Sequence, residues 1–396
     1  MTKRCSTEAV GPAALPERTV VTFAPTDEQR ELQRLVRRFC EEKSPITEVR
    51  RLMESDSGFD TGVWDQMGKE LGLQSLHIPE AYGGMGFTVV ELGLVLEEMG
   101  RALLCVPFLS SVVLAANAIL VAGDEEQRQT LLPGIAAGEV RGALAFAEGT
   151  DTWAPEAVAT EAVADGDRYR LSGAKTMVVD GHTAHTLVAS ARVPGSAGRE
   201  GISLFIVDCE DAPGMTRAVM PTLDQTRKLA TVTFDETPAR LLGGEGAGGP
   251  ALERTLQLAA VALASEQVGG AARCLDMSVE YAKVRQQFGR PIGSFQAVKH
   301  RCADMLLGVE SARSASYYAM SAAADDIELP LASALARAHC SEVFSRAASD
   351  CIQIHGGIGF TWEHDAHLYL KRARGSEALL GGIGHHQDLV ASGIGL

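Results

Sequence analysis

Two short segments near the C-terminal end combine a cation, amides and glycines in a way that suits the binding of a nucleotide diphosphate. The first is Arg285-Gln-Gln-Phe-Gly-Arg-Pro-Ile-Gly-Ser-Phe-Gln296. Its proline forbids continuation of a preceding helix, so the backbone N–H groups of residues 286–289 lose their helical partners and become available to a phosphate. Arg285 adds a fixed positive charge, and Phe288 can cover the face of an adenine ring.

The second segment, Gln353-Ile-His-Gly-Gly-Ile-Gly-Phe360, repeats this arrangement. Gln353 offers an amide, and Gly356 and Gly357 allow a close approach of the backbone. Either segment alone could be an ordinary turn between two helices. Their occurrence together favours a shared binding function.

Two other patterns are weaker. Gly244-Glu-Gly-Ala-Gly-Gly249 matches a dinucleotide fingerprint, but a long helical pattern follows it instead of a βαβ unit, which favours a hinge. His364 and His367 have no matching cluster of cysteines or carboxylates, so we expect no metal site.

The elements that would position these residues follow an α–β–α order. Residues 1–25 predict a loose arm, and residues 26–140 predict an all-helical domain with helices near 62–71, 89–104, 111–122 and 124–138. Residues 141–243 contain short β-branched runs separated by turn residues, which indicates an antiparallel barrel or sandwich. In residues 244–396, helical patterns at 252–285, 294–325, 329–354 and 375–392 predict an antiparallel four-helix bundle. The expected fold class is therefore α+β.

Composition limits the partners and the compartment. The net charge of -15 argues against nucleic acid and anionic membranes. Eight scattered cysteines without a Cys-x-x-Cys spacing suit reduced thiols. The longest apolar run is too short to span a membrane, and no secretory signal is evident at the start. We therefore expect a cytoplasmic protein.

With this order of domains, the two C-terminal segments resemble the flavin-adenine motifs of the acyl-CoA dehydrogenase family. The resemblance covers about residues 26–390. It implies FAD as cofactor, an acyl-CoA thioester as substrate, and a homo- or heterotetramer in which these segments hold the ADP half of a flavin whose ring lies mainly in another subunit. The implied cofactor-binding residues are Arg285, Gln287, Phe288, Gln296, Gln353, Gly356 and Gly357.

The chain departs from the family at the reacting end of the cofactor. The family reaction removes an α-proton of the thioester with a carboxylate while hydride passes to the flavin. The two positions from which members supply this base are occupied here by Leu380 and Ala259. The segments that usually contact the ring are also altered: this chain has Ala147-Glu-Gly-Thr-Asp-Thr-Trp-Ala154 and Met177-Val-Val179.

Three hypotheses follow. The chain could be a homomeric dehydrogenase with a displaced base, for which Glu266 and Glu377 are the candidates. It could be the base-lacking subunit of a heteromeric dehydrogenase, similar to partner subunits of actinobacterial steroid side-chain dehydrogenases, and this is the hypothesis we favour. It could also be a flavin-dependent monooxygenase, which needs no α-proton base.

Overall fold

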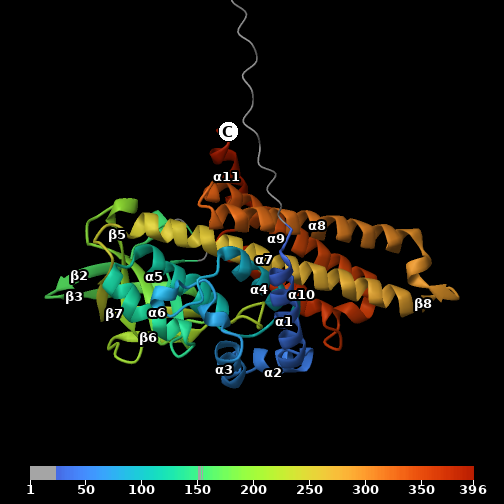
Figure 1. Ribbon diagram of the computed structural model, residues 1–396, viewed down its shortest axis with the longest axis horizontal. Coiled ribbons are helices and arrows are strands. Elements are labelled where there is room, and N and C mark those ends of the chain that lie inside the picture. Colours follow the sequence, from blue (N-terminus) through green and yellow to red (C-terminus); the bar gives the residue numbers. More distant parts are fainter. Residues whose placement is uncertain (1–23, 150–152, 154) are drawn as a thin grey trace, which may run out of the picture.

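The computed structural model describes residues 24–149, 153 and 155–396 of the chain, in an α–β–α order. Long helices of the C-terminal region run along the longest dimension, with the β-strands at one end and the short strand β8 at the other (Figure 1). The predicted arm lies largely outside the described residues. Among the described residues, no helix is both long and apolar enough to cross a membrane.

The first region is helical, as predicted. Thr26 caps the first helix with a capping box, in which its side chain and that of Gln29 each accept a hydrogen bond from the other residue's backbone N–H. The sequence did not reveal the helix that starts directly after Pro45, nor the π-helical turns at 109–115. The elements are α1 (Asp27–Lys43), α2 (Ile46–Met53), α3 (Thr61–Lys69), α4 (Val89–Ala102), η3 (Leu109–Ala115), α5 (Ala116–Ala122) and α6 (Glu125–Ala136).

The middle region is a closed sheet. Its strands are β1 (Gly142–Ala145), β2 (Glu161–Asp165), β3 (Arg168–Val179), β4 (Thr186–Arg192), β5 (Ile202–Asp208), β6 (Met215–Val219) and β7 (Leu229–Leu242). Of these, β1, β4 and β5 are almost wholly buried, while β3 and β7 carry a mixture of buried and exposed side chains. The order β4-β2-β3-β7-β5 returns to β4, which closes the barrel, with β1 added to β4 and β6 to β7. Most pairs are antiparallel, but β1 and β2 each pair with β4 in parallel, so the sheet is mixed.

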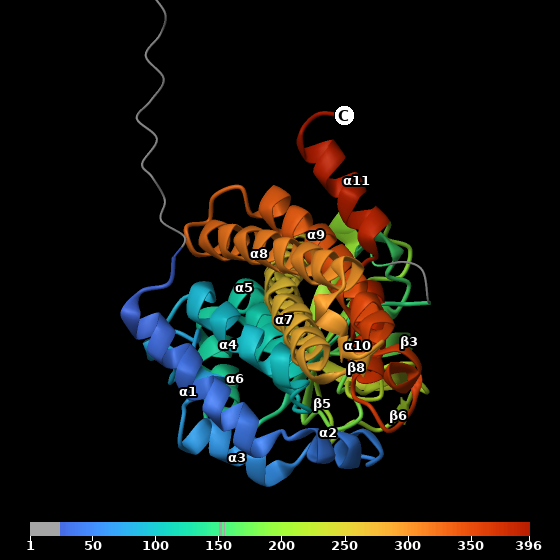
Figure 2. The ribbon, with the colours of Figure 1, turned by 90° about the vertical axis from the view of Figure 1, so that its right-hand side faces the viewer.

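The last region is the predicted bundle, formed by α7 (Gly248–Val284), α8 (Gln296–Ala324), α9 (Leu329–His355) and α10 (Ala366–Ala378), with α11 (Ile383–Gly393) packed on α9. Figure 2 views this bundle from the β8 end, with α1, α4 and α6 beside it. The limits predicted at residues 140 and 243 remain predictions; β1 begins at Gly142 and α7 at Gly248.

Two glycines let α4 pack directly against the middle of α7. A Cβ atom on Gly269 would lie 1.7 Å from the carbonyl oxygen of Glu97, and one on Gly100 would lie 2.0 Å from that of Glu266. No side chain fits at these distances, so the two backbones can approach only because both residues are glycine. This contact fixes Glu266 between the N-terminal helices and the bundle.

One predicted helix was wrong. The pattern near 375–392 suggested a continuous helix, but α10 ends at Ala378 and α11 begins at Ile383. Between them Leu380 and Gly381 have φ angles of 62° and 97°, a left-handed conformation that ends a right-handed helix. The break places Leu380, the position of a missing base, in a connecting turn.

Candidate functional site

The first predicted nucleotide segment forms an exposed hairpin at the end of α7. β8 (Gln286–Gln287) pairs with β9 (Arg290–Pro291), and the intervening Phe288 and Gly289 both have positive φ angles. This pairing uses part of the backbone that we expected to be free. The ring of Phe288 is 90% exposed, and Arg285 forms no ion pair with a carboxylate in the described part of the chain. A cation and an aromatic face are therefore available at this tip.

The second segment lies where α9 ends. Gly356 has a φ of 65°, and a Cβ atom added to Gly356 or to Gly357 would meet nothing within 4 Å. These glycines thus border open space, and Gln353 is exposed beside them. Phe360 and Trp362, which follow, are 80% and 60% exposed.

The two segments meet in space. Tyr281, one turn before Arg285, packs against the ring of His355, which directly precedes Gly356; the ring centroids are 4.4 Å apart. Gln296 is the first residue of α8, directly after the hairpin segment. The fold thus gathers these predicted cofactor-binding residues at one end of the bundle, although their role stays a prediction.

Both base positions lie in apolar surroundings. Ala259 is fully buried and Leu380 is 5% exposed, and both belong to one hydrophobic cluster that also contains Phe146, Leu252 and Leu263. Neither Ala259 nor Leu380 has a side chain that can accept a proton from a substrate, so neither position supplies the base here.

A cavity of about 180 Å³ lies beside Leu380. It is bounded by α7, α11, the first turn of α9 and the loop that contains Trp153, and its lining includes Trp153, Leu256, Ala260, Leu331, Leu380, His386 and Leu389. Its surface is mainly apolar, which suits an acyl chain or the arm of a thioester. At one side, Arg199 is neutralised by Glu253, 2.7 Å away.

Glu266, one candidate for a displaced base, is enclosed by an ionic cluster that we define as Asp224, Arg227, Glu266 and Arg372. Arg227 donates to one oxygen of Glu266 at 2.5 Å, and Arg372 donates to the other at 2.8 Å. Burial alone would raise the pKa of Glu266, but the two guanidinium groups outweigh burial and lower the pKa to about 2. A carboxylate with so low a pKa is a poor proton acceptor, so these contacts favour a structural role for Glu266.

Arg372 ties three parts of the chain together through this cluster. It comes from α10, donates to Asp224 at 2.8 Å and to the hydroxyl of Thr226 at 2.6 Å, and reaches Glu266 on α7. The space that remains around the cluster, which Asp180 at the end of β3 also borders, is about 20 Å³. That volume holds little more than one water molecule.

Acid should weaken this cluster. Because the pKa of Glu266 is lower in the folded chain than the ordinary value of 4.5, its contribution to stability is present above pH 4.5 and is lost as the pH falls toward 2. We expect the difference in unfolding free energy between the wild type and Glu266→Gln to shrink by about 2 kcal/mol between pH 6 and pH 3. Urea unfolding at both pH values measures it. The exposed Glu126→Gln is the control, and a difference independent of pH would contradict the prediction.

Glu377, the other candidate base, lies on the last turn of α10. Its carboxylate accepts hydrogen bonds from Ser345 at 2.7 Å and from Arg374 at 2.8 Å, and its side chain is 25% exposed. It does not line the cavity beside Leu380. The structure therefore directs this carboxylate to two partners of its own and away from the apolar cavity.

The segments expected near a flavin ring are only partly described, because residues 150–152 and 154 lie outside the described residues. In the part that is described, Glu148 forms a buried ion pair with Lys175 of β3 at 2.5 Å. Burial lowers the pKa of Lys175 to about 8, while the nearby Glu148 carboxylate opposes that effect. Val178 and Val179 are buried, and Met177 has a positive φ of 51° at a bulge in β3.

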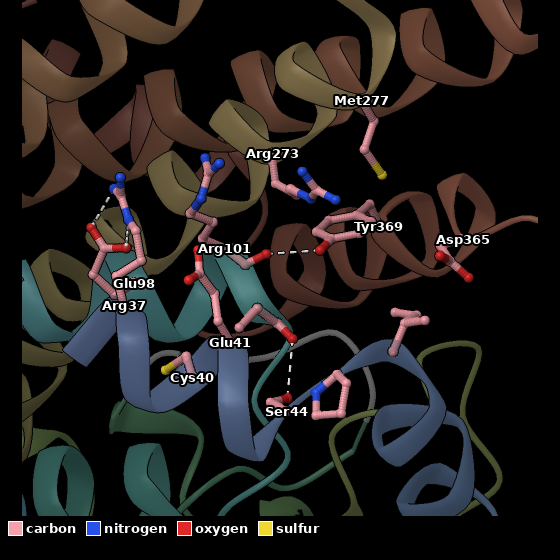
Figure 3. Close-up of a pocket in the computed structure, with 13 residues that line it drawn as sticks. Arg37, Cys40, Glu41, Ser44, Glu98, Arg101, Arg273, Met277, Asp365 and Tyr369 are labelled. Atoms are coloured by element: carbon pink, nitrogen blue, oxygen red, sulfur yellow. Dashed lines mark hydrogen bonds and ion pairs between the residues drawn. The ribbon is translucent and has the colours of Figure 1, made fainter. Parts of the chain in front are cut away.

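Another cavity, of about 310 Å³, lies between α1, α4, α7 and α10 (Figure 3). Most of its charged groups are already paired: Arg37 binds Glu98 through two hydrogen bonds, and Arg101 binds Asp276 at 2.5 Å. The hydroxyl of Tyr369 donates to the carbonyl oxygen of Arg101. This cavity contains none of the predicted site residues.

Sequence reasoning missed the ionic cluster and the Lys175–Glu148 pair. Their members come from distant segments with no common spacing, so nothing in the sequence indicated that they would meet. The place of His386 beside Leu380 depends on the unpredicted break between α10 and α11.

The chain matches known proteins along nearly all of its length. Models of the N-terminal, middle and C-terminal domains of acyl-CoA dehydrogenases match residues 26–139, 143–236 and 246–395. The chain is 36% identical over 357 residues to the acyl-CoA dehydrogenase IpdE2 of Mycolicibacterium smegmatis, covering 89% of this chain and 95% of that protein. It is 31% identical over 356 residues to an acyl-CoA dehydrogenase of Bacillus subtilis, covering 88% and 93%.

Several solved structures also resemble the chain over nearly its whole length. The ChsE4–ChsE5 complex from Mycobacterium tuberculosis matches with a TM-score of 0.84 at 28% identity, covering 94% of this chain and 99% of the matched chain. A steroid ACAD, Tcur3481–Tcur3483, matches with a TM-score of 0.82 at 34% identity, covering 93% and 97%. Butyryl-CoA dehydrogenase from Megasphaera elsdenii matches with a TM-score of 0.89 at 26% identity, covering 94% and 100%.

Proposed function

Because the chain belongs to the acyl-CoA dehydrogenase family, a family of oxidoreductases that act on CH–CH groups, we propose that it is the base-lacking subunit of a heteromeric, FAD-dependent acyl-CoA dehydrogenase. In this proposal the exposed hairpin and the Gly356-Gly357 turn hold the ADP half of FAD. The ring and the catalytic base belong to a homologous partner subunit. The reaction would be α,β-dehydrogenation of a fatty-acyl or steroid side-chain thioester.

The observation that carries this proposal is the contrast between the two ends of the chain's cofactor motifs. At the adenosine end, Arg285, Phe288 and the two glycines are exposed and bordered by open space, so they fit a nucleotide diphosphate. At the reacting end, the two positions of the base are occupied by Leu380 and Ala259, which are buried and cannot accept a proton. The residues present fit one half of FAD and do not fit the chemistry of the other.

The surroundings of the two candidate bases support the same proposal. A displaced base in a homomeric enzyme would need a carboxylate that is free to take a proton, with a pKa near the working pH. Glu266 is held by two arginines, and Glu377 by Ser345 and Arg374. Two of the similar solved structures carry names with two components, ChsE4–ChsE5 and Tcur3481–Tcur3483, and a heteromeric assembly of this chain would be of that kind.

The proposal is tested by purifying the chain alone and together with a homologous dehydrogenase subunit that retains the base. FAD, when bound, accepts the hydride and loses its visible absorbance. We expect the chain alone to carry little FAD and to show no bleaching with an acyl-CoA. We expect the complex to bind FAD and to be bleached when an acyl-CoA is added. A full complement of FAD that an acyl-CoA bleaches in the isolated chain would refute the subunit role. Oxygen consumption with a hydroxylated product would instead favour the monooxygenase.

Arg285→Ala is expected to weaken the binding of FAD to the complex by about tenfold or more, because it removes a charge-assisted contact to a phosphate. Titration calorimetry with FAD and the apo-complex measures this change. Arg290→Ala is the matched control: it removes the same charge from the same hairpin, but this guanidinium lies over the ring of Phe295, 4.2 Å from its centroid. Equal losses in both variants would show that only the overall charge of the hairpin matters.

A further inference from the structure

The short segment after the Gly356-Gly357 turn leaves three large apolar side chains exposed. Ile358 is 42% exposed, Phe360 80% and Trp362 60%, and they occupy every second position of a stretch of five residues. We call these three residues the aromatic turn. Single exposed apolar residues are common on protein surfaces, but several that follow one another closely mark an interaction site. The aromatic turn is therefore a candidate for contact with another molecule.

The aromatic turn is held in place although it is exposed. The backbone N–H and the hydroxyl of Thr361 both donate to the carbonyl oxygen of Ile358, at 3.0 and 2.8 Å. The Nζ atom of Lys371 lies 4.0 Å from the centroid of the Trp362 ring, and the ring of His367 meets the same ring edge-on at 4.7 Å. Side chains that are fixed in advance lose less conformational entropy when a partner binds. These contacts thus prepare the turn for an interface.

The cofactor does not account for the rings of the aromatic turn. FAD has one adenine, and the exposed ring of Phe288 on the hairpin is available to cover it. Phe360 and Trp362 then remain exposed, and Lys371 forms no ion pair with a carboxylate in the described part of the chain. Tryptophan is among the residues that dominate the binding energy of protein–protein interfaces. These observations favour a protein as the molecule that covers the turn.

The place of the aromatic turn indicates which protein this is. Ile358 directly follows Gly357. In the proposed function the Gly356-Gly357 turn holds the diphosphate of an FAD molecule whose ring lies in the partner subunit. Because one molecule is bound on both sides, the partner must approach this turn to within the length of a dinucleotide. The surface of that subunit is therefore the one that comes close to the exposed rings.

We propose that the aromatic turn is an anchor for the homologous partner subunit, with Phe360 and Trp362 packed in an apolar hollow of that subunit and Lys371 beside one of its carboxylates. The inference rests on the proposed function, because that function supplies the partner. It adds that the two polypeptides are held together by direct contacts between side chains as well as by the cofactor they share.

Sedimentation velocity of the chain mixed with a homologous subunit that retains the base, at saturating FAD, tests the anchor. Trp362→Ala and Phe360→Ala are each expected to weaken the association about tenfold or more. Phe87→Ala is the control with unchanged association, because it removes a ring that is 48% exposed in the N-terminal region. At subunit concentrations that keep the complex assembled, Trp362→Ala is expected to bind FAD as the wild type does. A loss of FAD affinity as large as that of Arg285→Ala would assign the ring to the cofactor and overturn the inference.

A second measurement follows Trp362 itself in the wild-type chain. The chain has three tryptophans, and after labelling with 5-fluorotryptophan the ¹⁹F resonance of Trp362 is assigned by comparison with Trp362→Phe. This resonance is expected to shift when the unlabelled partner is added and to stay in place with FAD alone. A shift with FAD alone, or wild-type association in both alanine variants, would overturn the inference and leave the proposed function intact. If the wild-type subunits did not assemble around FAD, the proposed function would fall and the inference with it.

Discussion

Replacing Arg372 by alanine is expected to lower the free energy of unfolding by about 3–5 kcal/mol. The side chain of Arg372 is 3% exposed and holds the carboxylates of Asp224 and Glu266 at 2.8 Å each. Removing it leaves two buried carboxylates short of a counter-charge, although Glu266 keeps its ion pair with Arg227. A buried charge without a partner lowers the free energy of unfolding by more than an intact buried ion pair raises it, because the loss of hydration is no longer offset by the opposite charge.

The midpoint of urea unfolding, compared for wild type and variant, measures this effect. Arg30→Ala is the control, since Arg30 and Asp27 form an exposed ion pair on α1 with side-chain exposures of 52% and 92%. Exposed pairs of this kind contribute at most about 1 kcal/mol. If Arg372→Ala were no more destabilising than Arg30→Ala, the ionic cluster would not hold the regions together.

Glu148→Ala is expected to have an effect of similar size, about 3–5 kcal/mol, in the β region. The carboxylate of Glu148 is the ion-pair partner of the fully buried Lys175, and it accepts hydrogen bonds from Ala159 and Thr160. Among the described residues, its loss leaves the buried ammonium group with two neutral acceptors, Ser190 and the carbonyl oxygen of Phe146. The same unfolding measurement applies.

A double-mutant cycle tests whether the loss comes from the pair itself. Lys175→Met in the background of Glu148→Ala removes the orphaned charge, so the double variant is expected to be more stable than Glu148→Ala alone. Strictly additive losses would show that the two side chains act independently. Glu161→Ala, an exposed carboxylate on the neighbouring strand β2, serves as the control.

The fold was accessible from the sequence because its signals are local. Apolar periodicity marked the long helices, and short β-branched runs marked the strands. One strand, β3, is longer than the short runs suggested: Tyr169 and Thr176 lie on the same strand, because bulges between Leu171 and Val178 let it bend without ending. The sequence does mark the break at Leu380, because Gly381 and Gly382 follow it, but the apolar periodicity continues across these glycines and predicts one helix.

Only half of the site could be predicted from the sequence, because only half of it consists of local motifs. Arg285 and Gly356 lie in motifs in which neighbouring residues share one function, so the motif could be read along the chain. The partners of Glu266 could not, because Arg227 and Arg372 come from two other segments, and only packing brings them to α7. Counting along the sequence showed that the usual bases are missing. It did not show that two arginines form ion pairs with Glu266, one of the candidates for a displaced base.

The length of α7 has a consequence for how the cofactor is shared. Gln257, beside the cavity, and Arg285, at the hairpin, are separated by 28 residues along this one helix, which corresponds to about 40 Å. An extended dinucleotide is shorter than that. The hairpin and the cavity of one copy are thus too far apart to share one FAD molecule, which supports the proposal that the cofactor is shared between polypeptides.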